Sequence, residues 1–347
     1  MKIGILSFSE NGNHLSEKIS KWLEKSSYND VEIQRCEHGK LAEWTEKHFK
    51  DDAIIYIGST GIAVRAIAPF VCSKLSDPAV IVIDELGTFC ISLLSGHIGG
   101  ANLLASSIAS FIDAKAVITT ATDRNNVFAV DEWAVSQGMI IYDTKNILPV
   151  AVKLLNKENT LMISEVRITG KIPDGIILKH IDKVDKSSLF NSINCDVLVS
   201  PRYSSHVSPL HIVPRVTVLG IGCRRGTTKA EIETAYVSAC KQIKLHPKSL
   251  AKICSIDIKK NESGLLEFAS EYGIIPTFYN SDELKSVSGD IESSDFVTKI
   301  TGVDNVCERS AILGSGSNGK VLMKKNIING IAISIYIANC EYTFDYK

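Results

Sequence analysis

Short, mainly apolar runs alternate with amphipathic segments along the first part of the chain. The runs at 2–8 and 53–57 have the length and composition of buried strands. Residues 14–25 and 41–49 place apolar side chains close to helical spacing, and a half-apolar strand at 31–35 lies between them. Strands that alternate with helices are typical of α/β folds, so this part is predicted to be a mostly parallel sheet covered by helices.

The next segment predicts a hairpin followed by a glycine-rich turn. After a break at Asp77-Pro78, strands at 79–84 and 88–94 flank Glu85-Leu86-Gly87, which has turn composition. A helix up to Ile112, a strand at 116–120 and a helix at 131–137 then continue the α/β alternation.

The pattern weakens from 146 to 214 and then returns. A helix at 148–155, short strands and three prolines predict a small α/β middle domain that ends in a linker at 200–215. A strand at 216–219, a helix at 229–241 and a closing hairpin over 320–338 predict a second α/β domain at the C-terminus. The predicted domains are 1–143, 144–213 and 214–347.

Composition narrows the class of protein. The chain has 347 residues, 45% of them hydrophobic, and a net charge of −1, so nothing in its overall charge favours nucleic acid or an anionic membrane. Nine scattered cysteines without a CxxC motif do not form a disulfide framework or a zinc ribbon. His206 and His211 flank Pro209 and cannot share one helix face, so no metal site is expected there. We expect a cytoplasmic protein.

The best candidate for a working site is the turn within Ile91–Ala109. Three glycines in five positions let the backbone turn sharply and approach a ligand, and helix-opening amides after such a turn bind anions. His97 adds a side chain that exchanges protons near neutral pH. The alternative is a purely structural turn. The candidate binding residues here are Ser95, Gly96, Gly99, Gly100 and Asn102.

Polar turns also follow other predicted strands, at 58–61 and 119–123. Ligands of open α/β sheets bind outside the carboxyl ends of strands. If these turns share one edge of the sheet with the His97 turn, then Arg65, His97, Asn102 and Asp123 converge there. The alternative is that strand ends are polar in any such fold.

A second candidate turn, Gly220–Thr228, reads GIGCRRGTT. Its glycine spacing departs by one residue from the dinucleotide fingerprint, and Arg224 and Arg225 stand where a pyrophosphate would approach. Paired guanidinium groups beside a helix start suit carboxylates or phosphates, so we favour an anion clamp over a nicotinamide site. Lys259 and Glu262 follow the next strand. A solvated basic turn is the remaining alternative.

Seven segments of the chain, taken together and in their order, resemble those of the cobalt-precorrin-5A hydrolase family of anaerobic cobalamin biosynthesis. The most specific pair is LLSGHIGGAN (93–102) with GIGCRRGTT (220–228). The others are GIAVRAIAP (61–69), SDPAVIVIDELG (76–87), VITTATD (117–123), IDIKKNESGLLEFA (256–269) and GVDNVCE (302–308). The middle segment matches only in position and length.

The resemblance implies hydrolysis of a δ-lactone on a cobalt-bearing, ring-contracted tetrapyrrole, with release of acetaldehyde to give cobalt-precorrin-5B. It implies no cofactor from the protein, because cobalt arrives with the substrate. It also implies that the C-terminal domain is similar to one that occurs as a stand-alone protein in cobalamin pathways.

Residue chemistry then suggests roles for this reaction. His97 is the expected general acid/base, assisted by Glu85 or Asp123, and the amides of Gly99 and Gly100 are candidate oxyanion donors. Arg65, Arg224, Arg225, Lys259 and Glu262 are the expected substrate-binding residues outside the His97 turn.

Two rival functions remain open. One is a tetrapyrrole carrier without catalysis, and the other is a nicotinamide-dependent reductase that uses Gly220–Gly226. A tetrapyrrole is the expected small-molecule partner, nucleic acid and membranes are not expected, and a homodimer is possible.

Overall fold

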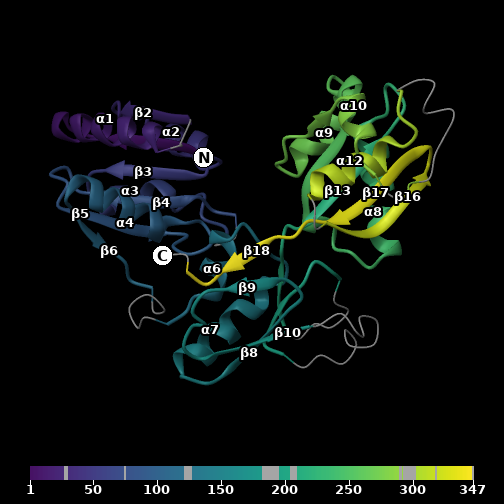
Figure 1. The fold of residues 1–347 in the computed structure, drawn as a ribbon. Coiled ribbons are helices and arrows are strands. Elements are labelled where there is room, and N and C mark those ends of the chain that lie inside the picture. The colour runs from purple at the N-terminus through teal and green to yellow at the C-terminus, as the bar shows by residue number, and fades with distance from the viewer. Residues whose placement is uncertain are drawn as a thin grey trace. The chain divides into compact units, whose positions relative to one another are not determined.

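The computed structural model describes residues 1–26, 30–73, 76–120, 127–181, 195–203, 209–288, 291, 302–316 and 319–345. The chain divides into two compact units, Met1–Glu132 and Trp133–Lys347 (Figure 1). The predicted division into three domains stays a prediction. Among the described residues, the helices are all too short or too polar to cross a membrane.

The first unit is built on a six-stranded sheet with the order β2-β1-β3-β4-β5-β6. Strands β1 to β4 are mutually parallel, β5 is antiparallel to β4, and β6 is parallel to β5. The predicted mostly parallel α/β fold is therefore confirmed. The strands are β1 (Lys2–Ser7), β2 (Asp30–Arg35), β3 (Ala53–Ile57), β4 (Ala79–Ile83), β5 (Phe89–Leu94) and β6 (Lys115–Val117).

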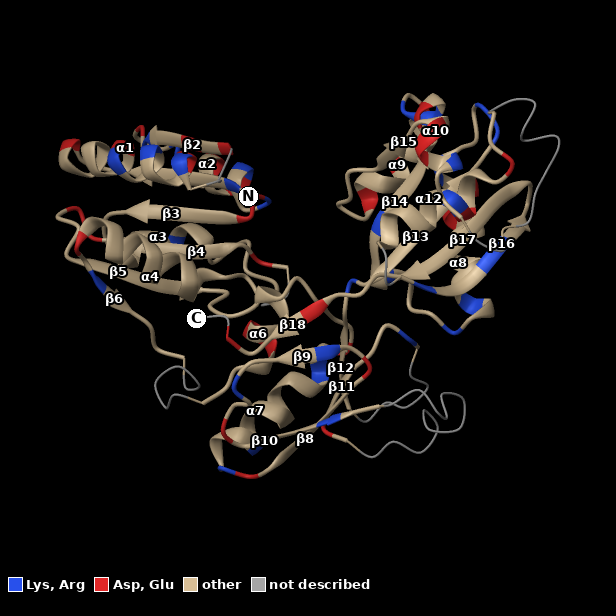
Figure 2. Cartoon of the chain, in the orientation of Figure 1, with Lys and Arg blue, Asp and Glu red and all other residues tan. Residues whose placement is uncertain are grey.

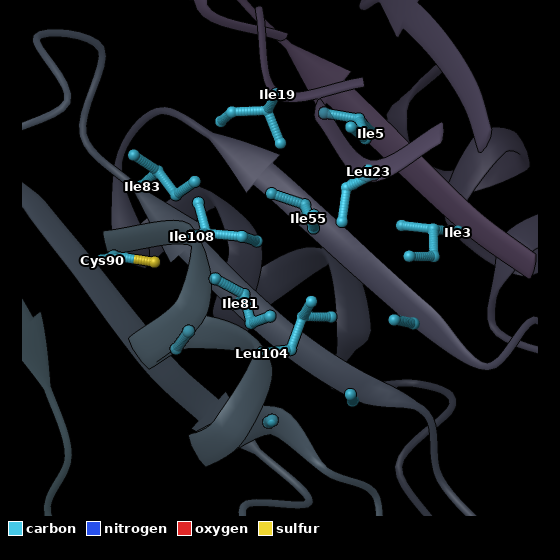
Figure 3. Packing of buried hydrophobic residues seen from close by; sticks show 14 of the residues in the cluster. Ile3, Ile5, Ile19, Leu23, Ile55, Ile81, Ile83, Cys90, Leu104 and Ile108 are labelled. Atoms are coloured by element: carbon cyan, nitrogen blue, oxygen red, sulfur yellow. The ribbon is translucent and has the colours of Figure 1, made fainter. Parts of the chain in front are cut away.

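Helices cover both faces of this sheet because its central strands are apolar on both sides. Helices α1 (Glu10–Lys25) and α4 (Ala101–Ile112) bury Ile19, Leu23, Leu104 and Ile108 against isoleucines of the central strands (Figure 3). Helices α2 (Leu41–His48) and α3 (Thr60–Ile67) pack on the other face with Trp44, Ala63 and Ile67. These two hydrophobic clusters, one on each face, hold the sheet whose strands end in the candidate turns.

The hairpin between β4 and β5 reverses the direction of the sheet. Ile83 pairs with Cys90 near the turn, and Leu94 at the end of β5 pairs with Val80 at the start of β4. Residues that follow β5 therefore lie at the edge where the parallel strands β1, β3 and β4 begin. The turn at 58–61 follows β3 and lies at the opposite edge, where those strands end.

The second unit contains two five-stranded sheets. The first has the order β10-β8-β11-β12-β7 and combines parallel pairs with an antiparallel pair of β12 with β7. Its elements are β7 (Ile140–Ile141), α7 (Ile147–Leu155), β8 (Thr160–Ser164), β10 (Ile176–His180), β11 (Val197–Val199) and β12 (Leu210–Val213). A short pair, β9 (Arg167–Thr169) with β18 (Glu341–Thr343), accompanies it.

The interpretation of 200–215 as a linker is wrong in part, because β12 lies within it. All four residues of β12 are buried between β11 and β7. His211 of this strand is 4% exposed, and its Nε2 lies 3.0 Å from the Ser200 carbonyl oxygen.

The other sheet of the second unit has the order β15-β14-β13-β17-β16. Helices α8 (Lys229–Gln242) and α9 (Ser263–Glu271) cover one face, and α12 (Val306–Ser315) packs on the other. The predicted closing hairpin is confirmed as β16 with β17. The remaining elements are β13 (Thr217–Gly222), β14 (Leu250–Ile256), β15 (Thr277–Tyr279), α10 (Ser281–Lys285), β16 (Lys320–Ile328) and β17 (Ile331–Ile337).

Two glycines of β13 give a matched test of this packing. A Cβ at Gly220 would overlap the Cys307 carbonyl oxygen of α12, whereas a Cβ at Gly222 would lie 3.7 Å from the Ala332 Cβ. Gly220→Ala is expected to lower the free energy of unfolding by about 1–3 kcal/mol, and Gly222→Ala by roughly 0.5 kcal/mol or less. Urea unfolding of both variants measures this difference. Equal losses would contradict the close packing of α12 on β13.

Candidate functional site

The His97 turn is a tightly closed loop between β5 and α4. Ser95 has φ of 56° and Gly100 has φ of 80°, so the chain enters the left-handed region twice within six residues. A Cβ at Gly99 would overlap the Ser95 side chain, and a Cβ at Gly96 would lie 2.6 Å from Asn102 Oδ1. Gly96 and Gly99 are thus required by the close approach of the turn to itself, and Gly100 by its left-handed backbone.

Backbone hydrogen bonds within the turn use several of its amides. The N–H groups of Ala101 and Asn102 donate to the carbonyl oxygens of Ser95 and Gly96, at 3.2 and 2.9 Å. The Gly100 N–H donates to the His97 carbonyl oxygen at 2.9 Å. In this conformation the Gly100 amide is occupied, so the oxyanion-donor hypothesis now concerns Gly99.

Ser95 and Asn102 hold the turn from inside. Asn102 is 6% exposed; its Oδ1 accepts from Ser92 Oγ at 2.7 Å, and its Nδ2 donates to Thr120 Oγ1 at 2.8 Å. Ser95 Oγ donates to the Asp77 carbonyl oxygen at 3.0 Å. These bonds give both residues a framework role that the sequence did not reveal, and their contact with substrate stays a prediction.

His97 lies beside a carboxylate that the sequence analysis missed. Its Nδ1 is 3.3 Å from Oδ2 of Asp131, and the two side chains are 15% and 10% exposed. Asp131 stands in the first turn of α6 (Val130–Ser136). Burial alone would raise the pKa of this carboxyl, but the hydrogen bond and charge of His97, with nearby backbone amides, lower it below its ordinary value. The pair is therefore a histidine–aspartate dyad with an ionised carboxylate.

The predicted convergence of Arg65, His97, Asn102 and Asp123 at one edge is wrong for Arg65. A Cβ built on Gly61 would lie 3.7 Å from Arg65 Nη1, which places the guanidinium over the start of α3, at the edge where β3 ends. The hairpin reversal puts His97 at the other edge. Asp123 lies outside the described residues, so its predicted role is not addressed.

Glu85 cannot assist His97 in this fold. It is an exposed residue of the turn between β4 and β5, whereas His97 follows the far end of β5. A six-residue strand spans roughly 20 Å, which is far beyond hydrogen-bond reach. The carboxylate that lies beside His97 among the described residues is that of Asp131.

The second turn brings together most of the residues predicted for it. Arg224 and Arg225 are exposed at its tip. Lys259 Nζ lies 3.1 Å from Glu262 Oε1, and the Gly226 N–H donates to Glu262 Oε2 at 3.0 Å. The turn is thus a small cationic cluster with one carboxylate inside it.

The local geometry disfavours a dinucleotide site at Gly220–Gly226. Gly220 and Gly222 still belong to β13, and Gly220 permits the close contact with α12. In the dinucleotide fingerprint, the first glycine makes the tight turn after the strand. In this chain the first glycine, Gly220, instead lies within β13 and allows α12 to pack closely on the strand.

Among the described residues, His, Cys, Asp and Glu nowhere gather in groups of three or more that could hold a metal ion.

Comparisons with known proteins cover both turns. The family model described as Cobalamin synthesis G N-terminal matches residues 43–123, and Cobalamin synthesis G C-terminus matches residues 217–336. The His97 turn lies within the first match and the Arg224 turn within the second. Asp131 lies beyond the end of the first match.

Curated relatives extend over most of the chain. A cobalt-precorrin-5A hydrolase of Priestia megaterium is 35% identical over 302 residues, 81% of this chain and 77% of the relative. A cobalt-precorrin-5A hydrolase of Salmonella typhimurium is 35% identical over 301 residues, 83% of this chain and 82% of the relative. A probable cobalt-precorrin-5A hydrolase of Methanocaldococcus jannaschii is 26% identical over 349 residues, 98% of this chain and all of the relative. The chain therefore belongs to the cobalt-precorrin-5A hydrolase family.

Proposed function

We propose that this protein is a cobalt-precorrin-5A hydrolase that opens the δ-lactone of its tetrapyrrole substrate and releases acetaldehyde, giving cobalt-precorrin-5B. The family supplies the class of reaction. The mechanism rests on one observation: His97, in the glycine-rich turn after β5, lies beside the Asp131 carboxylate.

The first step is attack of water on the acyl carbon of the lactone. With Nδ1 directed at the Asp131 carboxylate, His97 Nε2 takes a proton from the attacking water. The acyl carbon–oxygen bond then breaks, and the leaving alkoxide recovers a proton from the imidazolium. Between these two proton transfers the Asp131 carboxylate stabilises the His97 imidazolium, as the aspartate of a catalytic triad does.

The second step breaks a carbon–carbon bond. The hydroxyl freed by lactone opening loses its proton to a base, its carbon becomes the carbonyl carbon of acetaldehyde, and the electron pair of the broken bond passes to the macrocycle. The macrocycle is then protonated. The dyad serves this step as well, because His97 is neutral again after the first step.

Substrate binding relies on local cations. Acidic and basic residues are interspersed along the helices and strands of each unit (Figure 2), and the net charge is only −1. A substrate with many acetate and propionate groups is therefore held by clusters such as Arg224, Arg225 and Lys259. The protein contributes no cofactor of its own in this proposal, since cobalt is part of the substrate.

The carrier hypothesis is the main alternative. A carrier would bind the tetrapyrrole without releasing acetaldehyde. The curated relatives favour the enzyme, because they are hydrolases.

Replacing His97 tests the catalytic role. His97→Ala is expected to lower kcat by about 10²–10⁴-fold, because a general base contributes that much, while substrate binding is retained. Trapping of acetaldehyde during anaerobic turnover gives the rate, and tetrapyrrole absorbance gives binding. Full activity of His97→Ala would remove His97 from the mechanism, and a wild-type protein that binds the lactone without releasing acetaldehyde would be a carrier.

Replacing Asp131 tests the dyad. The interaction that lowers the Asp131 pKa acts equally on the imidazolium, so Asp131→Asn makes His97 easier to deprotonate. The limb of the kcat/KM profile that rises with pH is expected to move to lower pH. The plateau is expected to fall about tenfold, the factor for 1.4 kcal/mol of lost stabilisation. Glu85→Gln serves as the control, and an unchanged profile in Asp131→Asn would refute the pairing.

Replacing the arginines of the second turn tests binding. Arg224→Ala and Arg225→Ala are each expected to raise KM about two- to fivefold with little change in kcat, as loss of an exposed ionic contact does. The effect should weaken at high salt. Arg167→Ala is a matched control, because Arg167 is an exposed arginine on β9 that pairs with Glu341. Equal effects of all three substitutions would argue against a specific clamp.

A further inference from the structure

The cationic side of the Arg224 turn already holds a carboxylate, and that carboxylate belongs to the protein. Glu262 Oε2 accepts from the Gly226 N–H at 3.0 Å, and Glu262 Oε1 lies 3.1 Å from Lys259 Nζ. The Glu262 and Lys259 side chains are 13% and 15% exposed. Both carboxylate oxygens are thus engaged as the oxygens of a bound acetate or propionate would be.

The Gly226 amide and Lys259 ammonium hold the Glu262 carboxylate firmly. The Gly226 hydrogen bond contributes most to lowering the pKa of Glu262, with further contributions from Lys259 and the charge of Arg225. Each of these groups would stabilise the carboxylate of a ligand in the same way.

The turn does not depend on Glu262 for its shape. A Cβ at Gly264 would overlap the Thr227 carbonyl oxygen, so the start of α9 packs directly on the turn. Thr227 Oγ1 donates to the Arg224 carbonyl oxygen at 2.9 Å, and Ser255 Oγ donates to the Ile221 carbonyl oxygen at 2.7 Å. These contacts fix the Gly226 amide from both sides without the Glu262 side chain.

The residues around the Arg224 turn offer both positive charge and an apolar side chain to a ligand. Arg224, Arg225 and Lys259 outnumber Glu262 and Glu231, which accepts from the Thr228 N–H at 2.8 Å, so the cluster keeps a positive charge with Glu262 in place. Ile258, directly before Lys259, is 54% exposed and offers an apolar contact beside the cations. A tetrapyrrole combines an apolar face with carboxylates at its edge.

We propose that Gly226 N–H, Lys259 and Arg225 form a carboxylate subsite that Glu262 fills until a carboxylate of the tetrapyrrole displaces it. This inference rests on the proposed function, since it takes the substrate to be a polycarboxylate tetrapyrrole. Glu262 is then a competitor of the substrate, in contrast to the direct binding role predicted from sequence.

The test compares Glu262→Gln with Glu271→Gln. Glu271 pairs with Lys229 on the same sheet domain and is 57% exposed, so both substitutions remove one negative charge. The probe is uroporphyrin, a stable porphyrin with acetate and propionate side chains, and its Kd is measured by fluorescence quenching. Glu262→Gln is expected to lower the Kd about two- to fivefold, the range for removal of one competing ionic contact. Glu271→Gln is expected to leave it unchanged.

The effect of Glu262→Gln on the Kd is also measured in a protein that carries Arg225→Ala. If Glu262 competes for the cationic subsite, the gain from Glu262→Gln shrinks once Arg225 is absent. Weaker or unchanged binding in Glu262→Gln, with a melting temperature like that of the wild type, would overturn the displacement proposal. So would an equal gain in Glu271→Gln.

The two proposals fail in distinguishable ways. If Arg224→Ala and Arg225→Ala weaken uroporphyrin binding but Glu262→Gln does not strengthen it, only the displacement is wrong. If the arginine substitutions leave binding unchanged, the subsite itself is refuted. Acetaldehyde release, which depends on His97, reports on the hydrolase function independently of either result.

Discussion

The antiparallel pairing of β5 with β4 decides where chemistry can take place in the first unit. Because of this pairing, the residues after β5 emerge at the edge where the parallel strands begin. His97 is thereby separated from Glu85 and from the turn that carries Arg65. The same edge receives the end of β6, and Thr120 reaches the Asn102 side chain there. The His97 turn is thus held by contacts that a wholly parallel sheet would not provide.

Close backbone approach is the second constraint, and it explains several of the glycines in and around the two turns. Gly99 permits contact with Ser95, Gly220 with α12, and Gly264 with the turn at Thr227. In each case a side chain would collide with protein atoms. The glycine-rich motifs therefore identify closely packed turns, and in the proposed mechanism the chemistry is carried by side chains on those turns, such as His97 and Arg225.

The sequence predicted the elements of the first unit closely because its strands are strongly apolar and its turns are well marked. The strand predicted at 53–57 has those bounds, and the strand predicted at 79–84 ends one residue earlier, at Ile83. β12 was missed because Pro209 and Pro214 flank a short strand that contains His211. Asp131 was missed because an acidic residue in a first helical turn is common, and only tertiary structure brings it to His97. The hairpin itself was predicted, but the prediction that Arg65 and His97 share an edge overlooked that the hairpin reverses the chain direction.

The central claim is that His97 activates a water that attacks the acyl carbon of the lactone. Anaerobic turnover in water enriched in heavy oxygen, with mass analysis of the tetrapyrrole product, tests it directly. A labelled oxygen is expected in the carboxylate freed from the lactone, formed rapidly by the wild type and slowly by His97→Ala. An unlabelled carboxylate, or labelling that is equally fast without His97, would contradict it.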